Sequence, residues 1–198
     1  MLKIKSIFLF TVLTALLACN GSSGIQSGAA ANLEGYTTEA LGPSVTRAYK
    51  LNANGSTIEE GYISNGKRNG SWLTYYDGDN KGKVKTIASY SDGILSGPYY
   101  EFSNRGQIET EVNYANNQYN GKFGTYKFGR TVKESYYKNN KLDGLTKEYD
   151  SKGKIQKEVN FKDGLQDGIM RYYDPEGNVT LEYIYKNGEK VSGGMVEK

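Results

Sequence analysis

The sequence predicts an all-β protein, an elongated single-sheet antiparallel meander built from repeated β-hairpins of about 24 residues. Three markers recur in register along it. Closing aromatic residues stand at Tyr90, Tyr114, Tyr137, Phe161 and Tyr185, at spacings of 24, 23, 24 and 24 residues. Inner glycines stand at Gly70, Gly97, Gly121, Gly144 and Gly168, and five positions after them come Tyr75, Phe102, Tyr126, Tyr149 and Tyr173. Chance does not hold three markers in register over five copies, so this is a repeat protein.

Two kinds of turn punctuate each unit. Dipeptides that favour two-residue hairpin turns, where the backbone needs positive φ, occur at Asn65-Gly66, Asp92-Gly93, Asp163-Gly164 and Asn187-Gly188. The second turn has the form Asp/Ser-x-x-Gly at residues 103–106, 150–153 and 174–177. An Asp or Ser side chain there can accept hydrogen bonds from the following backbone, and Gly suits the last position.

Between the turns, apolar residues alternate with period two, which indicates strands. Val179, Leu181, Tyr183 and Tyr185 are one such series. A unit of this size cannot bury an apolar face alone, so neighbouring units must stack. We expect tyrosines to cover one face of the sheet with their hydroxyl groups in water, and each inner glycine to allow a close approach of its neighbours. Residues 77–82 are an insertion and are expected to form a loop at one edge.

The repeats are expected to span residues 46–190, beginning with a partial unit, and residues 191–198 to form a C-terminal tail. The unit from Tyr114 to Tyr137 departs most from the pattern, because Asn116-Asn117 replaces Asn-Gly and the unit is one residue shorter. A long sheet with a free terminal strand could also pair edge to edge with a second copy.

The N-terminus has the features of a secretory signal peptide over residues 1–18. Lys3 and Lys5 precede an apolar run of 12 residues, 7–18, which is too short to cross a bilayer as a helix. The cysteine that follows, Cys19, is the single cysteine of the chain, and Leu16-Leu17-Ala18-Cys19 resembles the bacterial lipobox. That resemblance implies cleavage after Ala18 and acylation of Cys19, although Leu17 is less usual at its position.

Two or three acyl chains anchor a protein stably to a membrane. The resemblance therefore implies a lipid-anchored protein of the cell envelope that faces the periplasm or the exterior, on the outer membrane if two membranes are present. Residues 19–45 are rich in Gly, Ser and Ala and are expected to form a flexible tether. The alternative is a segment that becomes ordered on a partner.

Composition excludes several classes of function. The chain of 198 residues carries 25 basic and 22 acidic residues, and 23 against 22 without Lys3 and Lys5, so no basic field favours nucleic acid. Histidine is absent, which removes the commonest general base and metal ligand. With no thiol beyond Cys19 and no phosphate-binding glycine loop, no catalytic constellation can be named. We expect no enzyme activity, no metal and no cofactor.

The pattern Tyr-x-Asn-Gly-x-x-x-Gly-x-x-x-x-Tyr-x-x-x-Gly-x-x-x-x-Glu-x-x-Tyr resembles the bacterial variant of the MORN repeat. The sequence is similar over about residues 46–190 to the YwqK-like proteins, many of which are described as toxin–antitoxin antitoxins. The residues that match are those that build hairpins. The resemblance therefore implies the fold strongly, and an antitoxin function weakly.

Two sets of side chains are candidates for binding. A glutamate stands three residues before the closing aromatic at Glu59, Glu111, Glu134, Glu158 and Glu182, with Ile87 breaking the series. Such a column could bind a cation or a basic partner, but pairing with lysines on adjacent strands is the favoured interpretation. Exposed aromatic rings could stack on a sugar polymer or meet a protein, although the sheet also needs such rings as its own cover. The aromatic candidates are Trp72, Tyr75, Tyr100, Tyr126, Tyr149 and Tyr173, and Trp72 and the insertion are the non-repetitive points where a specific contact is expected.

The sequence thus predicts a non-catalytic envelope lipoprotein that presents a repeat surface for protein binding or scaffolding. One alternative is an antitoxin or immunity protein that neutralises a toxin by direct contact. The other is a protein that binds cell-wall polysaccharide through exposed aromatic residues.

Overall fold

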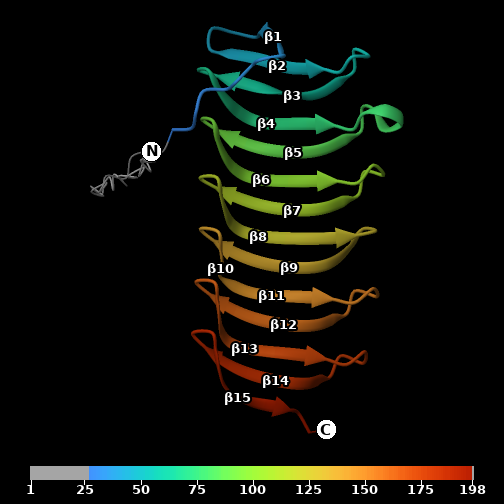
Figure 1. The fold of residues 1–198 in the computed structure, drawn as a ribbon, viewed down its shortest axis with the longest axis vertical. Helices are drawn as coiled ribbons and strands as arrows, with labels where there is room; N and C mark the ends of the chain where they lie inside the picture. Colours follow the sequence, from blue (N-terminus) through green and yellow to red (C-terminus); the bar gives the residue numbers. More distant parts are fainter. Residues whose placement is uncertain (1–26, 198) are drawn as a thin grey trace, which may run out of the picture.

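A computed structural model describes residues 27–197, and one open antiparallel sheet contains all of its strands (Figure 1). Each strand pairs with the next along the chain, except that β9 pairs with β11 and the short β10 pairs only with β9 beside this path. The all-β meander of hairpins predicted from the sequence is therefore confirmed.

The strands and one 3-10 turn have the following bounds. The first half of the sheet consists of β1 (Thr37–Ala40), β2 (Val45–Leu51), β3 (Thr57–Ser64), β4 (Lys67–Tyr75), the 3-10 turn η1 (Gly78–Asn80), β5 (Val84–Ser91), β6 (Ile94–Phe102) and β7 (Ile108–Ala115). The second half consists of β8 (Gln118–Lys127), β9 (Arg130–Lys138), β10 (Lys141–Leu142), β11 (Gly144–Tyr149), β12 (Ile155–Lys162), β13 (Leu165–Tyr173), β14 (Val179–Lys186) and β15 (Glu189–Met195).

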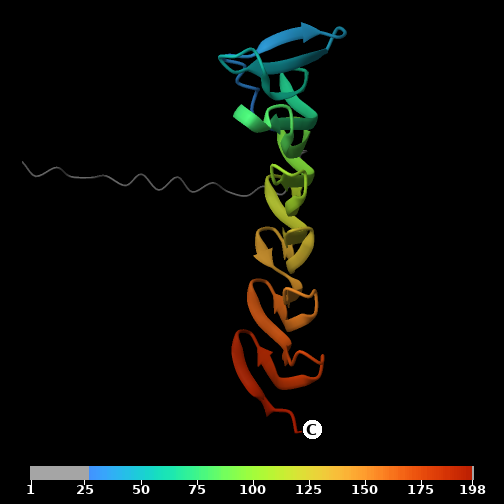
Figure 2. The same cartoon turned by 90° about the vertical axis from the view of Figure 1, so that its right-hand side faces the viewer.

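The sheet is a long twisted ladder, and Figure 2 shows that the strands rotate steadily along its length. Two-residue turns form one edge, at the left of Figure 1, which we call the short-turn edge. The opposite edge, the long-turn edge, carries the turns 52–55, 103–106, 128–129, 150–153 and 174–177 and the insertion 77–82 with η1. The insertion therefore forms an edge loop, as predicted.

Backbone geometry confirms the turn chemistry. Asn65 and Gly66 have φ values of 49° and 76°, as a two-residue turn requires. The divergent unit keeps this geometry, because Asn116 and Asn117 also have positive φ (52° and 61°) and the Asn117 side chain accepts a hydrogen bond from the backbone N–H of Leu95. The missing residue of that unit is lost at the long-turn edge instead, where Lys127 pairs directly with Arg130 around a two-residue turn.

The inner glycines occupy backbone that other residues rarely adopt. Gly144 has φ of 122° and pairs with Phe161. A Cβ atom on Gly144 would lie 3.1 Å from the Cβ of Tyr136 on β9, which pairs with β11. The close approach expected at the inner glycine is therefore present at this position.

The two faces of the sheet differ. The core face carries a central row of paired residues in which large and small side chains largely alternate. This central row consists of Gly61, Trp72, Ala88, Tyr99, Val112, Phe123, Ser135, Thr146, Val159, Met170 and Tyr183. The opposite face carries the glutamates and is called the ladder face. Tyrosines lie on both faces of the sheet. Tyr99 and Tyr183 belong to the central row, whereas the tyrosines five positions after the inner glycines point to the ladder face, because residues an odd number of positions apart on a strand point to opposite sides. The expectation that tyrosines cover a single face is therefore wrong.

The described residues bury few apolar side chains, namely Ala48, Ile63, Trp72, Ala88, Ile94, Val112, Val159 and Met170. Neither face of the described sheet is covered by a second layer along its length (Figure 2). The array therefore exposes both faces of one sheet.

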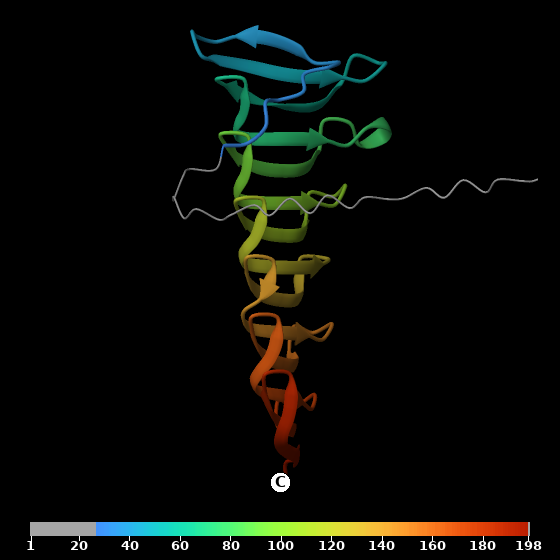
Figure 3. The ribbon, with the colours of Figure 1, turned by 60° about the vertical axis from the view of Figure 1, so that its left-hand side comes forward.

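The sheet extends beyond the predicted boundaries at both ends. We call residues 28–36 the N-terminal strap. The strap and β1 lie within the expected tether of residues 19–45, and residues 19–26 of that tether lie outside the described part. The strap begins at the short-turn edge, where Gly28 N–H donates to Asp92 O and Ala31 N–H donates to Gly66 O, both at 2.9 Å. It then crosses the first strands of the sheet towards β1 (Figure 3). Leu33 and Tyr36 of the strap pack on the buried cluster of Ala48, Ile63 and Trp72. The polar composition of the segment predicted a flexible tether instead. At the other end, β15 occupies most of the expected tail.

The first full unit is shifted by one residue from its predicted register. Ile63, not Tyr62, stands seven residues before the inner glycine Gly70, as the closing aromatics do in later units. Ile63 is buried whereas Tyr62 is exposed, because adjacent residues on a strand face opposite sides. Glu60, rather than Glu59, consequently occupies the glutamate column.

Candidate binding surface

Tyrosine hydroxyls and carboxylates pair along the ladder face. The hydroxyl groups of Tyr75, Tyr126 and Tyr173 donate to Glu60 (2.5 Å), Glu111 (2.7 Å) and Glu158 (2.6 Å), and each pair is separated by 15 residues. The tyrosine is the residue five positions after the inner glycine, so two of the sequence markers meet in one hydrogen bond.

The exceptions follow the same geometry. Ile87, which breaks the glutamate series, stands 15 residues before Phe102, and Phe102 has no hydroxyl group to donate. Glu134 instead accepts from Tyr136 at 3.0 Å, while no hydrogen bond of the Tyr149 hydroxyl is found in the described part of the chain. The unit without a carboxylate thus also lacks its donor.

Cations complete the glutamate column. Ion pairs on the ladder face join Arg47 to Glu60 (2.7 Å), Lys122 to Glu111 (3.0 Å), Lys147 to Glu158 (3.5 Å) and Arg171 to Glu182 (2.8 Å). Apart from Glu134, whose hydrogen-bond partner Tyr136 lies on its own strand, the carboxylates of the column are therefore paired with neighbours on adjacent strands. The favoured structural interpretation of the column is confirmed.

These contacts shift the acidity of both partners. The hydrogen bond from Tyr75, followed by that from Arg47, lowers the pKa of Glu60. The bond from Tyr126, followed by that from Lys122, does the same to the pKa of Glu111. Burial, and then the bond to Glu60, raises the pKa of Tyr75 to about 12. A charged glutamate beside a neutral tyrosine is thus the stable state at neutral pH.

Trp72 is not part of an exposed surface, which corrects the expectation that it is a contact point. Its side chain is 2 % exposed, and its indole N–H donates to Tyr62 O at 3.1 Å. The Arg68 guanidinium lies 4.0 Å from the ring centroid and Tyr36 of the strap packs edge-on at 6.0 Å. Gly61 provides the space, because a Cβ there would lie 2.3 Å from the indole ring.

The other aromatic candidates are half-buried. Tyr75, Tyr126 and Tyr173 present ring faces while their hydroxyl groups are bonded to glutamates. Tyr100 packs against Phe102 at 6.2 Å, and Tyr149 lines a groove at the long-turn edge. Their role in binding remains a hypothesis.

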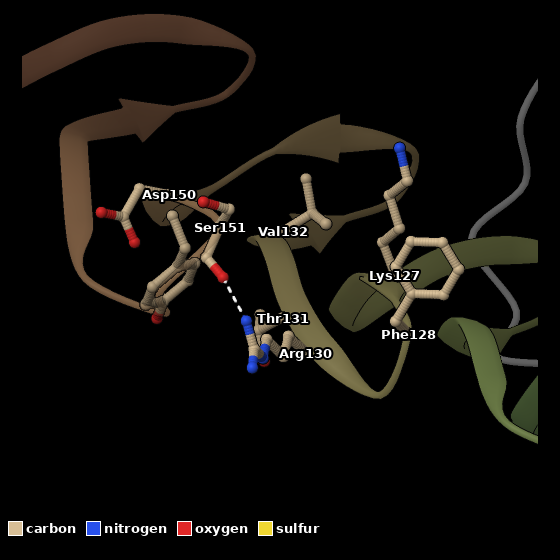
Figure 4. A pocket seen from close by; sticks show the side chains of 8 residues that line it. Lys127, Phe128, Arg130, Thr131, Val132, Asp150 and Ser151 are labelled. Atoms are coloured by element: carbon tan, nitrogen blue, oxygen red, sulfur yellow. Dashed lines mark hydrogen bonds between the residues drawn. The ribbon is translucent and has the colours of Figure 1, made fainter.

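Sequence reasoning missed the most exposed aromatic ring at the long-turn edge. Phe128 is 73 % exposed and has φ of 53°. It lines two grooves. One, of about 570 Å³, also contains Arg130, Val132 and Tyr149 (Figure 4). The other, of about 390 Å³, also contains Arg105 and Ile108. The 23-residue spacing of this unit was the signal available in the sequence.

No helix within residues 27–197 has the length and hydropathy of a membrane span. Among the same residues, no cluster of three acidic, histidine or cysteine side chains could hold a metal ion.

An open sheet of stacked hairpins with accessible faces and edges defines a repeat protein, of the kind whose surface serves binding or scaffolding. The model of the MORN repeat variant matches residues 142–163 and 166–187. Both matches fall on hairpins with the 24-residue period, and the Tyr–Glu bond seen there recurs upstream at Tyr126 and Tyr75. The repeats support a binding or scaffolding role.

Comparison with known proteins adds little beyond this match. No curated protein matches the chain. Among solved structures, TarM and an S. aureus TarM mutant in complex with fondaparinux, alpha-GlcNAc-glycerol and UDP align over 81 % of this chain at 9 % identity, with a TM-score of 0.28 for each. This chain covers 22 % of each of those chains, and a likeness at that level carries no argument about function.

Proposed function

We propose that the protein is a non-catalytic lipoprotein of the bacterial cell envelope that presents its sheet for protein binding or scaffolding. The observation that carries the binding role is the open sheet, whose described residues bury only eight apolar side chains. Because so few side chains are buried in a core, most of them remain accessible to a partner. Leu16-Leu17-Ala18-Cys19 supports the anchor.

The strap adds a geometric argument to this proposal. The backbone N–H of Gly28 donates to Asp92 O, and Gly28 lies nine positions after Cys19. Nine residues span at most about 30 Å when fully extended. An acyl anchor at Cys19 would therefore hold the start of the strap within about 30 Å of the membrane.

Membrane fractionation and intact mass of the wild type beside Cys19→Ser, both expressed in a bacterium, test the anchor. We expect acyl mass and membrane association for the wild type, and release or lack of processing for the variant. If both forms are soluble and begin at Met1, the envelope proposal fails and a cytoplasmic antitoxin becomes the leading alternative.

The antitoxin alternative rests on the resemblance to YwqK-like proteins. A toxin gene beside this one, and rescue of growth when both are expressed, would favour it. The polysaccharide alternative is less well supported, because Trp72 is buried and the hydroxyls of three of the other candidate tyrosines are bonded to glutamates. Sedimentation of the purified chain with cell wall tests it directly.

A further inference from the structure

The turn at Phe128 breaks a rule that the other two-residue turns obey. The first turn residue is an Asn or Asp with φ between 48° and 52° at Asn65, Asp92, Asn116, Asn139, Asp163 and Asn187. Phe128 adopts φ of 53° at the equivalent position. Asn and Asp tolerate this backbone, whereas a bulky residue there is an outlier of the kind found at functional sites.

The Phe128 ring receives little support from its own chain. The nearest ring interaction in the described residues is with the Lys127 ammonium, 5.8 Å from the ring centroid. Val132 and Ile108, one in each flanking groove, are also exposed, at 41 % and 37 %. Figure 4 shows Phe128 on one side of Arg130, with Asp150 and Ser151 on the other. An exposed apolar surface thus extends to both sides of the turn.

The neighbouring turns are tied together, except at this point. A cationic side chain in one turn region donates to the backbone carbonyl 21 residues later and so links successive turns. These bonds run from Lys83 to Asn104, from Arg130 to Ser151 and from Lys154 to Pro175. Gln107 occupies the equivalent position before Phe128, and its side chain forms no hydrogen bond within the described residues. The groove between turns 103–106 and 128–129 is therefore not closed by a bridge.

The charge around the turn is positive. The two grooves and the adjoining turn carry Arg105, Lys127, Arg130, Lys152 and Lys154 against Glu109 and Asp150. None of the ion pairs between described residues involves these cations. The Asp150 carboxylate accepts the backbone N–H groups of Lys152 and Lys154, both at 2.8 Å, which holds it within its own turn.

We propose that Phe128 and these five cations form a docking site for an acidic segment of a partner protein, with an apolar side chain of that segment packed on the Phe128 ring. Charge complementarity selects the acidic segment, since a basic one would meet like charges that outnumber the two carboxylates around them. An exposed aromatic ring supplies a large apolar contact at small entropic cost. This site rests on the proposed binding function and names its partner class.

Selection from a phage-displayed library of short random peptides tests the site, with the full-length Cys19→Ser chain as target and its Phe128→Asn derivative as counter-target. Asn suits positive φ, so this variant is expected to fold and to melt no lower than its parent. We expect enriched peptides to combine Asp or Glu with a large apolar residue. Fluorescence anisotropy should show affinity roughly tenfold weaker for Phe128→Asn and for Lys127→Glu, and weaker at high salt.

Tyr62→Asn is the matched control, because it removes another exposed aromatic ring (47 %) from a distant strand and should bind like the parent. Enrichment of neutral or basic peptides, or none that distinguish Phe128→Asn from its parent, overturns the site. The fractionation experiment is independent of this selection. If the wild type is lipid-anchored but the selection yields no such peptides, only the docking site is refuted. If the selection yields them but the wild type carries no anchor, only the envelope location is refuted.

Discussion

Replacement of Gly144 by Val tests the physical basis of the repeat. Gly144 lies at the start of β11 with φ of 122°, a region that residues with side chains rarely adopt. Its missing Cβ would approach the Cβ of Tyr136 to 3.1 Å, and valine adds two methyl groups beyond that point. The substitution therefore combines backbone strain with crowding between two neighbouring strands.

The magnitude follows from these two terms. Strain in a sparsely populated backbone region costs about 1–3 kcal/mol. Overpacking of a close contact costs about 1–3 kcal/mol more. We expect a loss of about 4 kcal/mol for Gly144→Val, which corresponds to a decrease in Tm of roughly 8–16 °C for a chain of this size. Gly144→Ala retains the strain with less crowding, so its loss should be about 2 kcal/mol.

Thermal and urea unfolding followed by circular dichroism measure the effect. Lys141→Val is the matched control, since Lys141 is exposed on the neighbouring β10 and its replacement should change stability by no more than about 0.5 kcal/mol. Equal melting temperatures for Gly144→Val and Lys141→Val would refute the close-approach argument. Equal losses for the Ala and Val variants would assign the whole effect to backbone strain.

Three further predictions concern the two faces. Trp72→Ala should cost about 4 kcal/mol, and hydrogen exchange should increase in β2–β5 and the strap more than in β11–β15, because each unit of an array contacts only its neighbours. Tyr126→Phe should lower the free energy of unfolding by about 1 kcal/mol through loss of its bond to Glu111, and equal effects of Tyr149→Phe would contradict the Tyr–Glu argument. The pKa of Tyr75, about 12 against an ordinary 10.0, lies above its unfolded value, so its stabilising effect is complete below pH 10.0 and is lost as pH rises through 12. Tyrosinate absorbance should therefore show several late-titrating groups, of which Tyr75→Phe removes one, since burial also raises the pKa of Tyr36 to about 12.

The hairpins could be predicted from the sequence because their determinants are local. A turn such as Asn65-Gly66 specifies its backbone within two residues, and period-two alternation specifies the strands beside it. The order of strands in a meander then follows from the chain itself. Register was less secure, because Tyr62 and Ile63 are adjacent and the aromatic residue matched the marker by type. The seven-residue spacing to Gly70, which the later units share, is held by Ile63 instead.

The candidate site depended on contacts that the sequence does not display. Trp72 is the sole tryptophan and looked available, but its burial requires Gly61 on one neighbouring strand and Tyr36 in a strap with few large apolar residues. One indication of the Phe128 turn was present in the sequence, namely that its unit is one residue shorter than the others. Its exposure follows from the conversion of a longer turn into a two-residue turn, which is a property of the edge as a whole.

The central row of the core face also makes the repeats non-interchangeable. The indole of Trp72 lies between Gly61 and Ala88, whereas the ring of Phe123 lies between Val112 and Ser135. Exchange of the β4–β5 and β8–β9 hairpins would place the indole beside Val112 instead of Gly61, which crowds it, and the phenyl ring beside Gly61 instead of Val112, which leaves a void. Although the units share one pattern, each therefore has a fixed place in the series. An additional copy could be inserted only if the residues on both sides of it changed in size.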